Sequence, residues 1–252
     1  EIKILLDCIA ASKSITAKKT EELSSKLSKM NNVYVEYGLN RQVYINNRAK
    51  SRNEEIFISI DAINKAINDN KKISFHYCDY NKDKELVVKK NLDGVDKEFI
   101  ANPIAMILKD DYYYLIMNRD KFNNLSNYRI DRMKCVRVLE DERKSLDVID
   151  GCSAEFDPAE FARKCIKMFI GIEKMVELEV SNDVISFIID ELGSDVKVNK
   201  IDNDKYKVIF KCICGKGLVK WLLQLGSDVK VINPLDLKDE LVAELKKTIE
   251  LY

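Results

Sequence analysis

The chain has 252 residues, in which 42 lysine and arginine residues balance 42 aspartate and glutamate residues, and 46% of all residues are apolar. At roughly 100–200 residues per domain, this length allows one large or two modest domains, and the apolar fraction excludes wholesale disorder. With only 8 glycines and 3 prolines, collagen-like and low-complexity classes are excluded, and no apolar run approaches the roughly 18 residues of a membrane span.

The first third of the chain is predicted to be helical. Apolar residues at helical spacing predict a helix over residues 2–9. Ser14 or Thr16 is expected to cap a second helix that runs to about Met30. Residues 31–47 are polar and predicted to form a loop, and residues 48–53 form a charged linker. Asn53 is then the expected N-cap of a third helix, whose apolar face would comprise Ile56, Ile60, Ile63 and Ile67.

The middle of the chain changes to strand periodicity. Apolar and polar residues alternate over residues 73–78, which predicts a strand. Residues 104–117 read as a hairpin around the polar turn at 109–111. Residues 128–133 and 135–139 are predicted to be further strands. Several short strands with tight turns over this length are typical of a small β-barrel.

The last third contains an internal repeat. The run Leu-Gly-Ser-Asp-Val-Lys-Val occurs at residues 192–198 and again at 225–231. Each copy follows an amphipathic helix, and Gly193 and Gly226 are suited to the left-handed position that ends a helix. Strands are expected at 175–180 and 205–212, ahead of the two helices. The resulting β-α-β-β-α-β order is the split ferredoxin-like pattern.

The cysteine and histidine content limits the chemistry. Seven cysteines with scattered spacing predict reduced thiols in a cytoplasmic protein. Cys212 and Cys214 form the closest pair; we favour two small apolar residues on a strand, with a metal pair as the alternative. His76 is the single histidine and is predicted to be solvated or to line a pocket. We therefore expect no metal ion and no cofactor.

Several runs together resemble one protein family. Residues 112–120 (Tyr-Tyr-Tyr-Leu-Ile-Met-Asn-Arg-Asp), followed by Tyr-Arg-Ile-Asp-Arg-Met at 128–133, resemble the WYL domain, with Tyr113 in place of the family's tryptophan. Phe-His-Tyr at 75–77 resembles the first strand of that domain, and Asn-Pro at 102–103 its characteristic proline. The repeat-containing block that ends at residues 231–237 is similar to the C-terminal extension called WCX.

This resemblance implies a bacterial transcription regulator of α+β class. Its parts would be a helical connector at 1–53, a small Sm-like WYL barrel with a leading helix at 54–145, and a ferredoxin-like WCX domain at 146–252. The winged helix-turn-helix that binds DNA would lie before Glu1. A helix-turn-helix fragment within residues 14–27 is the alternative, although no recognition helix rich in arginine, asparagine or glutamine follows it.

The resemblance also implies a ligand pocket in the barrel, lined by arginines with nearby tyrosines. A guanidinium group matches phosphate or carboxylate with a planar fork of donors, and tyrosine rings offer stacking faces, so the pocket suits an anion. On strand spacing, Arg129 and Asp131 share one side and Arg132 faces the other. In the alternative interpretation, Asp131 simply pairs with an arginine and residues 112–114 pack the barrel. The predicted ligand-binding residues are Arg119, Arg129, Arg132, Tyr114, Tyr77 and His76.

The predicted function is therefore ligand sensing and oligomerisation within a regulator that forms a homodimer, without enzymatic activity and without a membrane partner. The ligand would be a small anion, either nucleotide-like or a short nucleic-acid strand. An interaction scaffold without a ligand is the first alternative. A nucleotide-processing enzyme is the least favoured, because the sequence contains no P-loop, dinucleotide fingerprint or nucleophile elbow.

Overall fold

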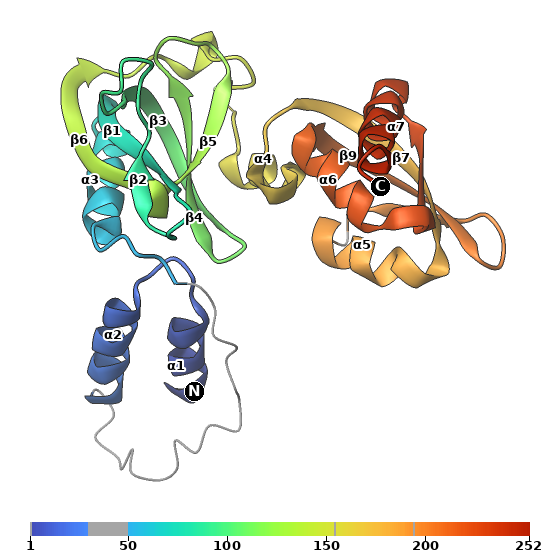
Figure 1. The fold of residues 1–252 in the computed structure, drawn as a ribbon, viewed down its shortest axis with the longest axis horizontal. Coiled ribbons are helices and arrows are strands. Elements are labelled where there is room, and N and C mark those ends of the chain that lie inside the picture. Colours follow the sequence, from blue (N-terminus) through green and yellow to red (C-terminus); the bar gives the residue numbers. More distant parts are fainter. Residues whose placement is uncertain (1, 30–49, 154, 194) are drawn as a thin grey trace. The chain divides into compact units, whose positions relative to one another are not determined.

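The computed structural model describes residues 2–29, 50–153, 155–193 and 195–252, and the loop predicted over 31–47 lies outside them. The chain divides into two compact units, residues 1–154 and 155–252, called here the first and second units. The fold class is α+β, as predicted, with one antiparallel sheet in each unit (Figure 1). Within the described residues, no helix combines the length and the apolar character needed to cross a membrane.

The first unit begins with two helices that lie side by side, α1 (Ile2–Ala11) and α2 (Ala17–Lys29) (Figure 1). Thr16 caps α2, because its Oγ1 accepts a hydrogen bond from the Lys19 amide at 3.1 Å. Lys50 donates from Nζ to the carbonyls of Ala10 at 3.0 Å and Ser12 at 2.9 Å. This cation therefore satisfies carbonyls at the end of α1 and ties residue 50 to the helical pair.

The third helix, α3 (Ile56–Asn68), packs against the barrel through Ile56, Ile63 and Ala66, which are all buried. The prediction that Asn53 caps this helix is wrong, because the helix begins at Ile56 with Glu55 as its N-cap residue. Asn53 lies two residues before Glu55 and accepts a hydrogen bond from the Glu55 amide at 3.0 Å. Its Nδ2 donates to the carbonyl of Met133 at 2.7 Å. Asn53 therefore begins the turn into α3 and also fixes that turn to the barrel.

Six antiparallel strands form the barrel-like sheet, and β3 and β4 are the predicted hairpin. The β3–β4 turn places Asp110 and Asp111 at φ 52° and 68°, the backbone that tight hairpins favour. Strand β1 pairs with β3 and β6 along its first part and with β2 near its end, and β3, β4 and β5 follow one another. The strands are β1 (Lys71–Tyr80), β2 (Leu86–Val88), β3 (Glu98–Lys109), β4 (Tyr112–Arg119), β5 (Leu125–Arg129) and β6 (Met133–Glu142).

Aromatic rings fill the centre of the barrel. Phe75 and Phe99 stack with ring centroids 5.4 Å apart, and Tyr128 meets both rings at steep angles. Apolar side chains of α3 and of neighbouring strands close around them. This contiguous burial supplies most of the hydrophobic stabilisation of the first unit.

The strand predicted over residues 128–133 is wrong. Strand β5 ends at Arg129, and a 3-10 turn, η1 (Ile130–Arg132), joins it to β6. The turn buries both Ile130 and the carboxylate of Asp131, which an extended strand would place on opposite faces. Consequently the expected division, with Arg129 and Asp131 on one side and Arg132 on the other, does not describe this segment.

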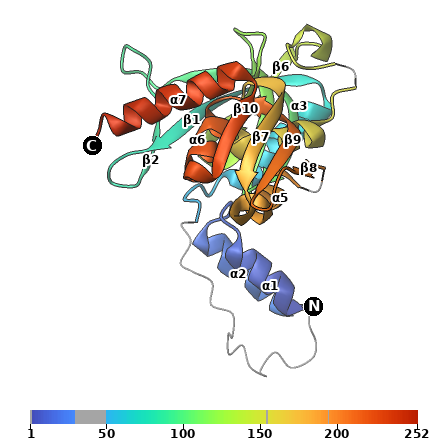
Figure 2. The ribbon, with the colours of Figure 1, turned by 90° about the vertical axis from the view of Figure 1, so that its right-hand side faces the viewer.

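The second unit has the predicted β-α-β-β-α-β order. Its sheet runs β10-β7-β9-β8 with every neighbouring pair antiparallel, and Figure 2 shows these strands side by side. Helices α5 and α6 pack on it through Ile188 and the fully buried Trp221. The helices and strands are α4 (Pro158–Lys164), β7 (Ile172–Ser181), α5 (Ile185–Leu192), β8 (Lys197–Lys200), β9 (Lys205–Cys214), α6 (Lys216–Gln224), β10 (Val229–Asn233) and α7 (Leu235–Ile249). The 3-10 turns of this unit are η3 (Ile166–Met168), η4 (Asn182–Val184) and η5 (Gly226–Asp228), whereas η2 (Leu146–Val148) belongs to the first unit.

The two copies of the sequence repeat occupy equivalent places in this unit. Gly193 follows α5 with φ 83°, and Gly226 follows α6 with φ 60°. Each position requires the positive φ that glycine adopts without steric cost. The repeat therefore marks two helix ends that each lead into a strand, β8 and β10.

Candidate functional site

Strand β4 carries two of the predicted ligand residues at opposite ends. Tyr114 stands opposite Arg129 of β5, whereas Arg119 stands opposite Ala101 of β3. Five residues of strand separate Tyr114 from Arg119, or roughly 17 Å, and an odd separation places their side chains on opposite faces. The six predicted residues therefore fall into two groups rather than one.

The first group centres on an ion pair between Arg129 and Asp131. Arg129 donates from Nε to Asp131 Oδ1 at 3.0 Å and from Nη2 to Oδ2 at 2.7 Å. The side chain of Asp131 is 2% exposed and that of Arg129 is 20% exposed. Burial acts to lower the pKa of Arg129, but the hydrogen bonds and charge of Asp131 outweigh it and hold that pKa above its ordinary value. The fork of Arg129 is thus already engaged by a buried carboxylate.

Tyr112 covers the same guanidinium. The Arg129 group lies 3.4 Å from the centroid of the Tyr112 ring, a close cation–π contact. Lys13, between α1 and α2, places its Nζ 5.7 Å from the same centroid and forms an ion pair with Asp111 at 3.2 Å. The ring of Tyr112 therefore links the arginine pair to the helical segment at the start of the chain.

Arg132 and Tyr77 lie beside this pair. Arg132 contacts Asp79 through Nη1 at 3.4 Å, while its buried Nε has no hydrogen-bond partner. Tyr77 packs edge-on against Tyr128, with centroids 4.7 Å apart. Burial raises the pKa of Tyr77 to about 12, against the opposing charge of Arg132. This hydroxyl is therefore a neutral donor at physiological pH.

Tyr114 is also partly buried, and burial raises the pKa of its hydroxyl above the ordinary value although the charge of Arg129 opposes this. It therefore remains protonated beside the arginine pair. Arg129, Arg132, Tyr77 and Tyr114 are not among the residues that line the cavity described next.

The second group lies at a cavity of about 430 Å³ lined by residues 97–100 and 119–122, called here the β3–β4 pocket. The Arg119 guanidinium lies 4.3 Å from the centroid of the Phe122 ring, and Lys97 Nζ lies 5.1 Å from that of Phe99. Lys121 adds a third cation to the lining. His76 does not line the pocket, but its Nδ1 lies 3.1 Å from the carbonyl of the lining residue Lys97.

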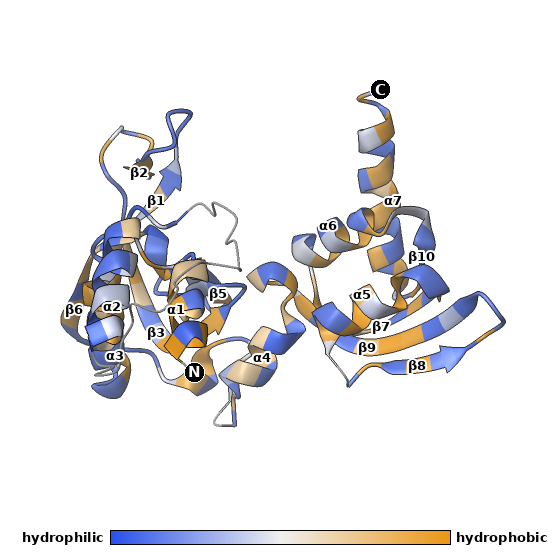
Figure 3. Ribbon diagram, turned by 90° about the horizontal axis from the view of Figure 1, so that it is seen from below, coloured by the Kyte–Doolittle hydropathy of each residue, from blue (hydrophilic) through white to orange (hydrophobic). Residues whose placement is uncertain are grey.

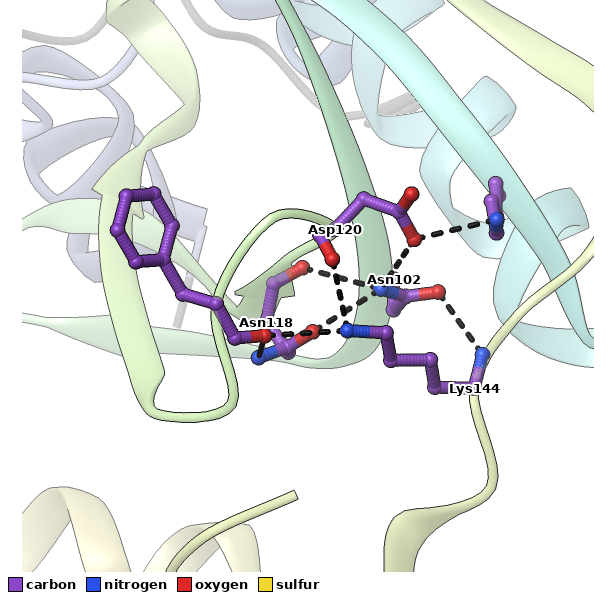
Figure 4. Close-up of polar contacts among 6 residues, drawn as sticks. Asn102, Asn118, Asp120 and Lys144 are labelled. Atoms are coloured by element: carbon purple, nitrogen blue, oxygen red, sulfur yellow. Dashed lines mark hydrogen bonds and ion pairs between the residues drawn. The ribbon is translucent and has the colours of Figure 1, made fainter. Parts of the chain in front are cut away.

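A buried polar network holds the loop that forms one wall of this pocket (Figure 4). Asn102 and Asn118 are fully buried and joined by a 3.0 Å hydrogen bond from Asn102 Nδ2 to Asn118 Oδ1. Asn118 Nδ2 donates to the carbonyls of Phe122 at 2.9 Å and Asn124 at 3.0 Å. Because each amide is satisfied inside the protein, the network fixes residues 118–124 in one conformation.

Lys144 and Asp120 complete the network. Lys144 donates from its amide to Asn102 Oδ1 at 2.8 Å and from Nζ to the Asp120 carbonyl at 2.7 Å (Figure 4). The carboxylate of Asp120 pairs with Lys72 at 3.1 Å. Burial opposes ionisation of Asp120, but hydrogen bonds from Lys72 and Asn102 hold its pKa below the ordinary value. Lys72 therefore neutralises this carboxylate. The remaining charged lining residues are three cations, Lys97, Arg119 and Lys121, and one carboxylate, Glu98.

The sequence identified Arg119 and His76 in this region but missed Lys97, Lys121 and Phe122. These residues come from two loops that only the β1–β3–β4 register brings together. The polar run at 118–121 before Phe122 was the available signal for a turn. Ligand binding by the six predicted residues stays a prediction.

The described cysteines do not gather into a metal site. Cys212 is buried and donates from Sγ to the Lys164 carbonyl at 3.3 Å, and Cys214 is partly buried. Burial raises the pKa of the Cys214 thiol to about 11, which disfavours the thiolate that a metal ion requires. Among residues that the structure describes, no three histidine, cysteine, aspartate or glutamate side chains are arranged to hold a metal ion.

Comparison with known proteins confirms the resemblance noted in the sequence. The WYL domain model matches residues 59–138, and the WCX domain model matches residues 176–249. Among solved structures, proteasome accessory factor B/C of Arthrobacter aurescens is similar with 15% identity and a TM-score of 0.31, over 79% of this chain and 28% of that chain. A CRISPR Cas-related protein is similar with 14% identity and a TM-score of 0.42, over 78% of this chain and 52% of that chain. No curated protein matches the chain.

Proposed function

Because this chain is a protein with a WYL domain followed by a WCX domain, we propose that it is the ligand-sensing and oligomerising portion of a transcription regulator. The barrel binds an anionic ligand, either nucleotide-like or a short nucleic-acid strand. The helical connector at 1–53, the barrel at 54–145 and the WCX domain at 146–252 divide these tasks. The family matches favour a regulator over an enzyme.

The observation that carries the proposal is the β3–β4 pocket. Its volume of about 430 Å³ falls within the roughly 300–1,000 Å³ typical of small-molecule sites. Lys97, Arg119 and Lys121 supply positive charge for a phosphate, and Arg119 adds a planar fork of donors. Phe122 and the guanidinium stacked on it offer flat surfaces to a base.

The Arg129 group supports a different task within the same proposal. Its guanidinium is bound on one edge by Asp131 and covered on one face by Tyr112. An anion that bound there would have to compete with a buried, bidentate carboxylate. We therefore rank the β3–β4 pocket first as the ligand site and assign Arg129 mainly to the architecture of the barrel.

The lysine that touches Tyr112 provides a physical route from barrel to connector. Lys13 belongs to the connector and contacts the β3–β4 turn through Asp111. A ligand that shifts β3 or β4 would change this contact. The change would in turn alter the position of α1 and α2 relative to the barrel. Such a shift requires different ligand affinities in two arrangements of the connector.

The experiment that tests ligand binding is fluorescence anisotropy with a labelled oligodeoxynucleotide, competed by nucleoside phosphates. The variant Lys97→Ala with Arg119→Ala should weaken binding by at least tenfold and flatten its salt dependence. The matched control, Lys65→Ala, removes an exposed lysine of α3 and should leave affinity unchanged. Equal affinity in the wild-type chain and the pocket variant would refute the pocket as the ligand site.

A further inference from the structure

Helix α7 presents a row of apolar side chains to solvent. Leu235, Val242, Leu245 and Ile249 are 66%, 40%, 43% and 71% exposed, and their spacing places them on one face of the helix. This row is called here the α7 stripe. The opposite face carries Leu237, which is 2% exposed and packs into the core of the second unit. Helix α7 thus has a covered apolar face and an uncovered one within that unit.

Figure 3 shows the course of α7 beside the other elements of the second unit. The N-terminal part of the helix lies near α6 and β10, while its C-terminal part projects away from the sheet with apolar segments along it. Isolated apolar side chains are ordinary on protein surfaces, but a continuous row along a helix indicates a binding surface.

The spacing of the stripe indicates the kind of partner. Leu235, Val242 and Ile249 are seven residues apart, and Leu245 follows Val242 by three. This is the repeat with which two helices pair along their length. The stem of Lys238, which fills the equivalent position in the first repeat, can lie along apolar neighbours while its charge remains in water.

The charges beside the stripe indicate that the partner helix is the same helix. Asp239 and Lys246 are exposed, opposite in sign and seven residues apart, so both flank the stripe on the same side. When two copies of α7 run antiparallel with Val242 opposite Leu245, Asp239 of each copy lies next to Lys246 of the other. The two-fold axis makes this ion pair occur twice.

A parallel pair lacks this complementarity. In a parallel pair, the residues beside Asp239 and Lys246 come from the other flank of the stripe, where Leu241 and Thr248 lie. Neither of these side chains carries a charge. The charge pattern therefore selects the antiparallel arrangement.

We propose that the α7 stripe is the homodimer contact, formed by antiparallel pairing of α7 with α7 of a second copy of this chain. The inference rests on the oligomerisation in the proposed function, takes it to be a homodimer, and names the surface that forms it. Because the stripe spans only about two heptads, the pairing is of modest affinity and populated at micromolar concentrations and above.

The test is sedimentation equilibrium of the whole chain at micromolar to submillimolar concentrations. Ile249→Lys should raise the dimer dissociation constant by more than tenfold, and this exposed substitution leaves the fold intact by circular dichroism. Asp239→Lys and Lys246→Asp should each weaken the dimer by about tenfold, since each replaces two attractive contacts by repulsive ones. Their combination should restore wild-type association.

The control is Lys247→Asp, which reverses a charge one residue farther along, on a face turned away from the stripe, and should leave association unchanged. A dimer that is insensitive to Ile249→Lys, or a charge-swapped pair that fails to restore association, would overturn the antiparallel α7 contact alone. A wild-type chain that stays monomeric throughout would overturn it together with the homodimer, while ligand binding at the β3–β4 pocket would remain measurable on its own.

Discussion

Removing Arg129 should destabilise the barrel. In Arg129→Ala, the carboxylate of Asp131 stays in a site where only 2% of its side chain is exposed, and it loses both hydrogen bonds from the guanidinium. Breaking a buried pair on one side costs about 3–5 kcal/mol. Since Arg129 itself is 20% exposed, water reaches part of the site, and we expect the lower end, about 3 kcal/mol.

The matched control is Arg132→Ala, three residues away. Arg132 touches Asp79 at 3.4 Å, and the side chain of Asp79 is 52% exposed. Exposed pairs of this kind contribute at most about 1 kcal/mol. A residue that served only to bind ligand would likewise leave stability unchanged, so the contrast between the two variants separates the architectural role from a binding role.

The assay is urea unfolding followed by near-ultraviolet circular dichroism of tyrosine, because most tyrosines belong to the first unit. Trp221 belongs to the second unit, so its fluorescence follows that unit separately. A loss of about 3 kcal/mol lowers the thermal midpoint of the first unit by roughly 6–12 °C. A loss of unfolding free energy below about 0.5 kcal/mol in Arg129→Ala, which is the usual scatter of surface substitutions, would refute the reasoning. Equal losses of unfolding free energy in Arg129→Ala and Arg132→Ala would also refute it.

Three further outcomes follow from the structure. Asn118→Ala should cost about 1–3 kcal/mol, because the buried Asn102 amide loses its acceptor on Asn118 and the Asn124 carbonyl loses its donor, while the Phe122 carbonyl keeps only Lys144. Hydrogen exchange should speed up over residues 119–124, and unchanged exchange there would contradict the network. The pKa of Tyr77 is raised to about 12 from 10.0. Its contribution to the stability of the fold is therefore complete below about pH 10 and is lost as the pH rises through 12. In an alkaline absorbance titration, Tyr77→Phe should lack the tyrosine step at the highest pH, and retention of that step would contradict the assignment. Gly226 has φ 60°, and nothing lies within 4 Å of an added Cβ, so Gly226→Ala should cost about 1–2 kcal/mol from backbone strain alone. Gly193 has φ 83° and ψ −177°, so Gly193→Ala should cost more. Thermal melts of the two variants check this order.

Periodicity was sufficient to predict most elements of the fold. The helices of the first third, the β3–β4 hairpin and the ferredoxin-like order of the second unit all have long, regular patterns. The end of the strand at Ile130 was not predicted, because apolar and polar residues alternate from Tyr128 to Met133. This alternation is compatible with an extended strand and also with a strand that ends in a turn. Only the burial of Asp131 beside Arg129 distinguishes the two conformations.

The candidate site was harder to predict than the fold. Arginines close together in the sequence were expected to share one pocket, yet Arg129 is engaged by its neighbour two residues along the chain, and Arg119 lies at the far end of β4. The walls of the β3–β4 pocket come from residues about 20 positions apart. Their proximity depends on strand register, which a single sequence does not specify when several strands are similar in length.

The most direct test of the central claim is amide chemical-shift mapping of the chain by NMR as a short oligodeoxynucleotide is added. Binding in the β3–β4 pocket predicts that the largest shifts fall on residues 97–100 and 119–122, with smaller ones along the β3–β4 turn towards Lys13. Shifts centred on Arg129 and Arg132, or confined to the second unit, would contradict it.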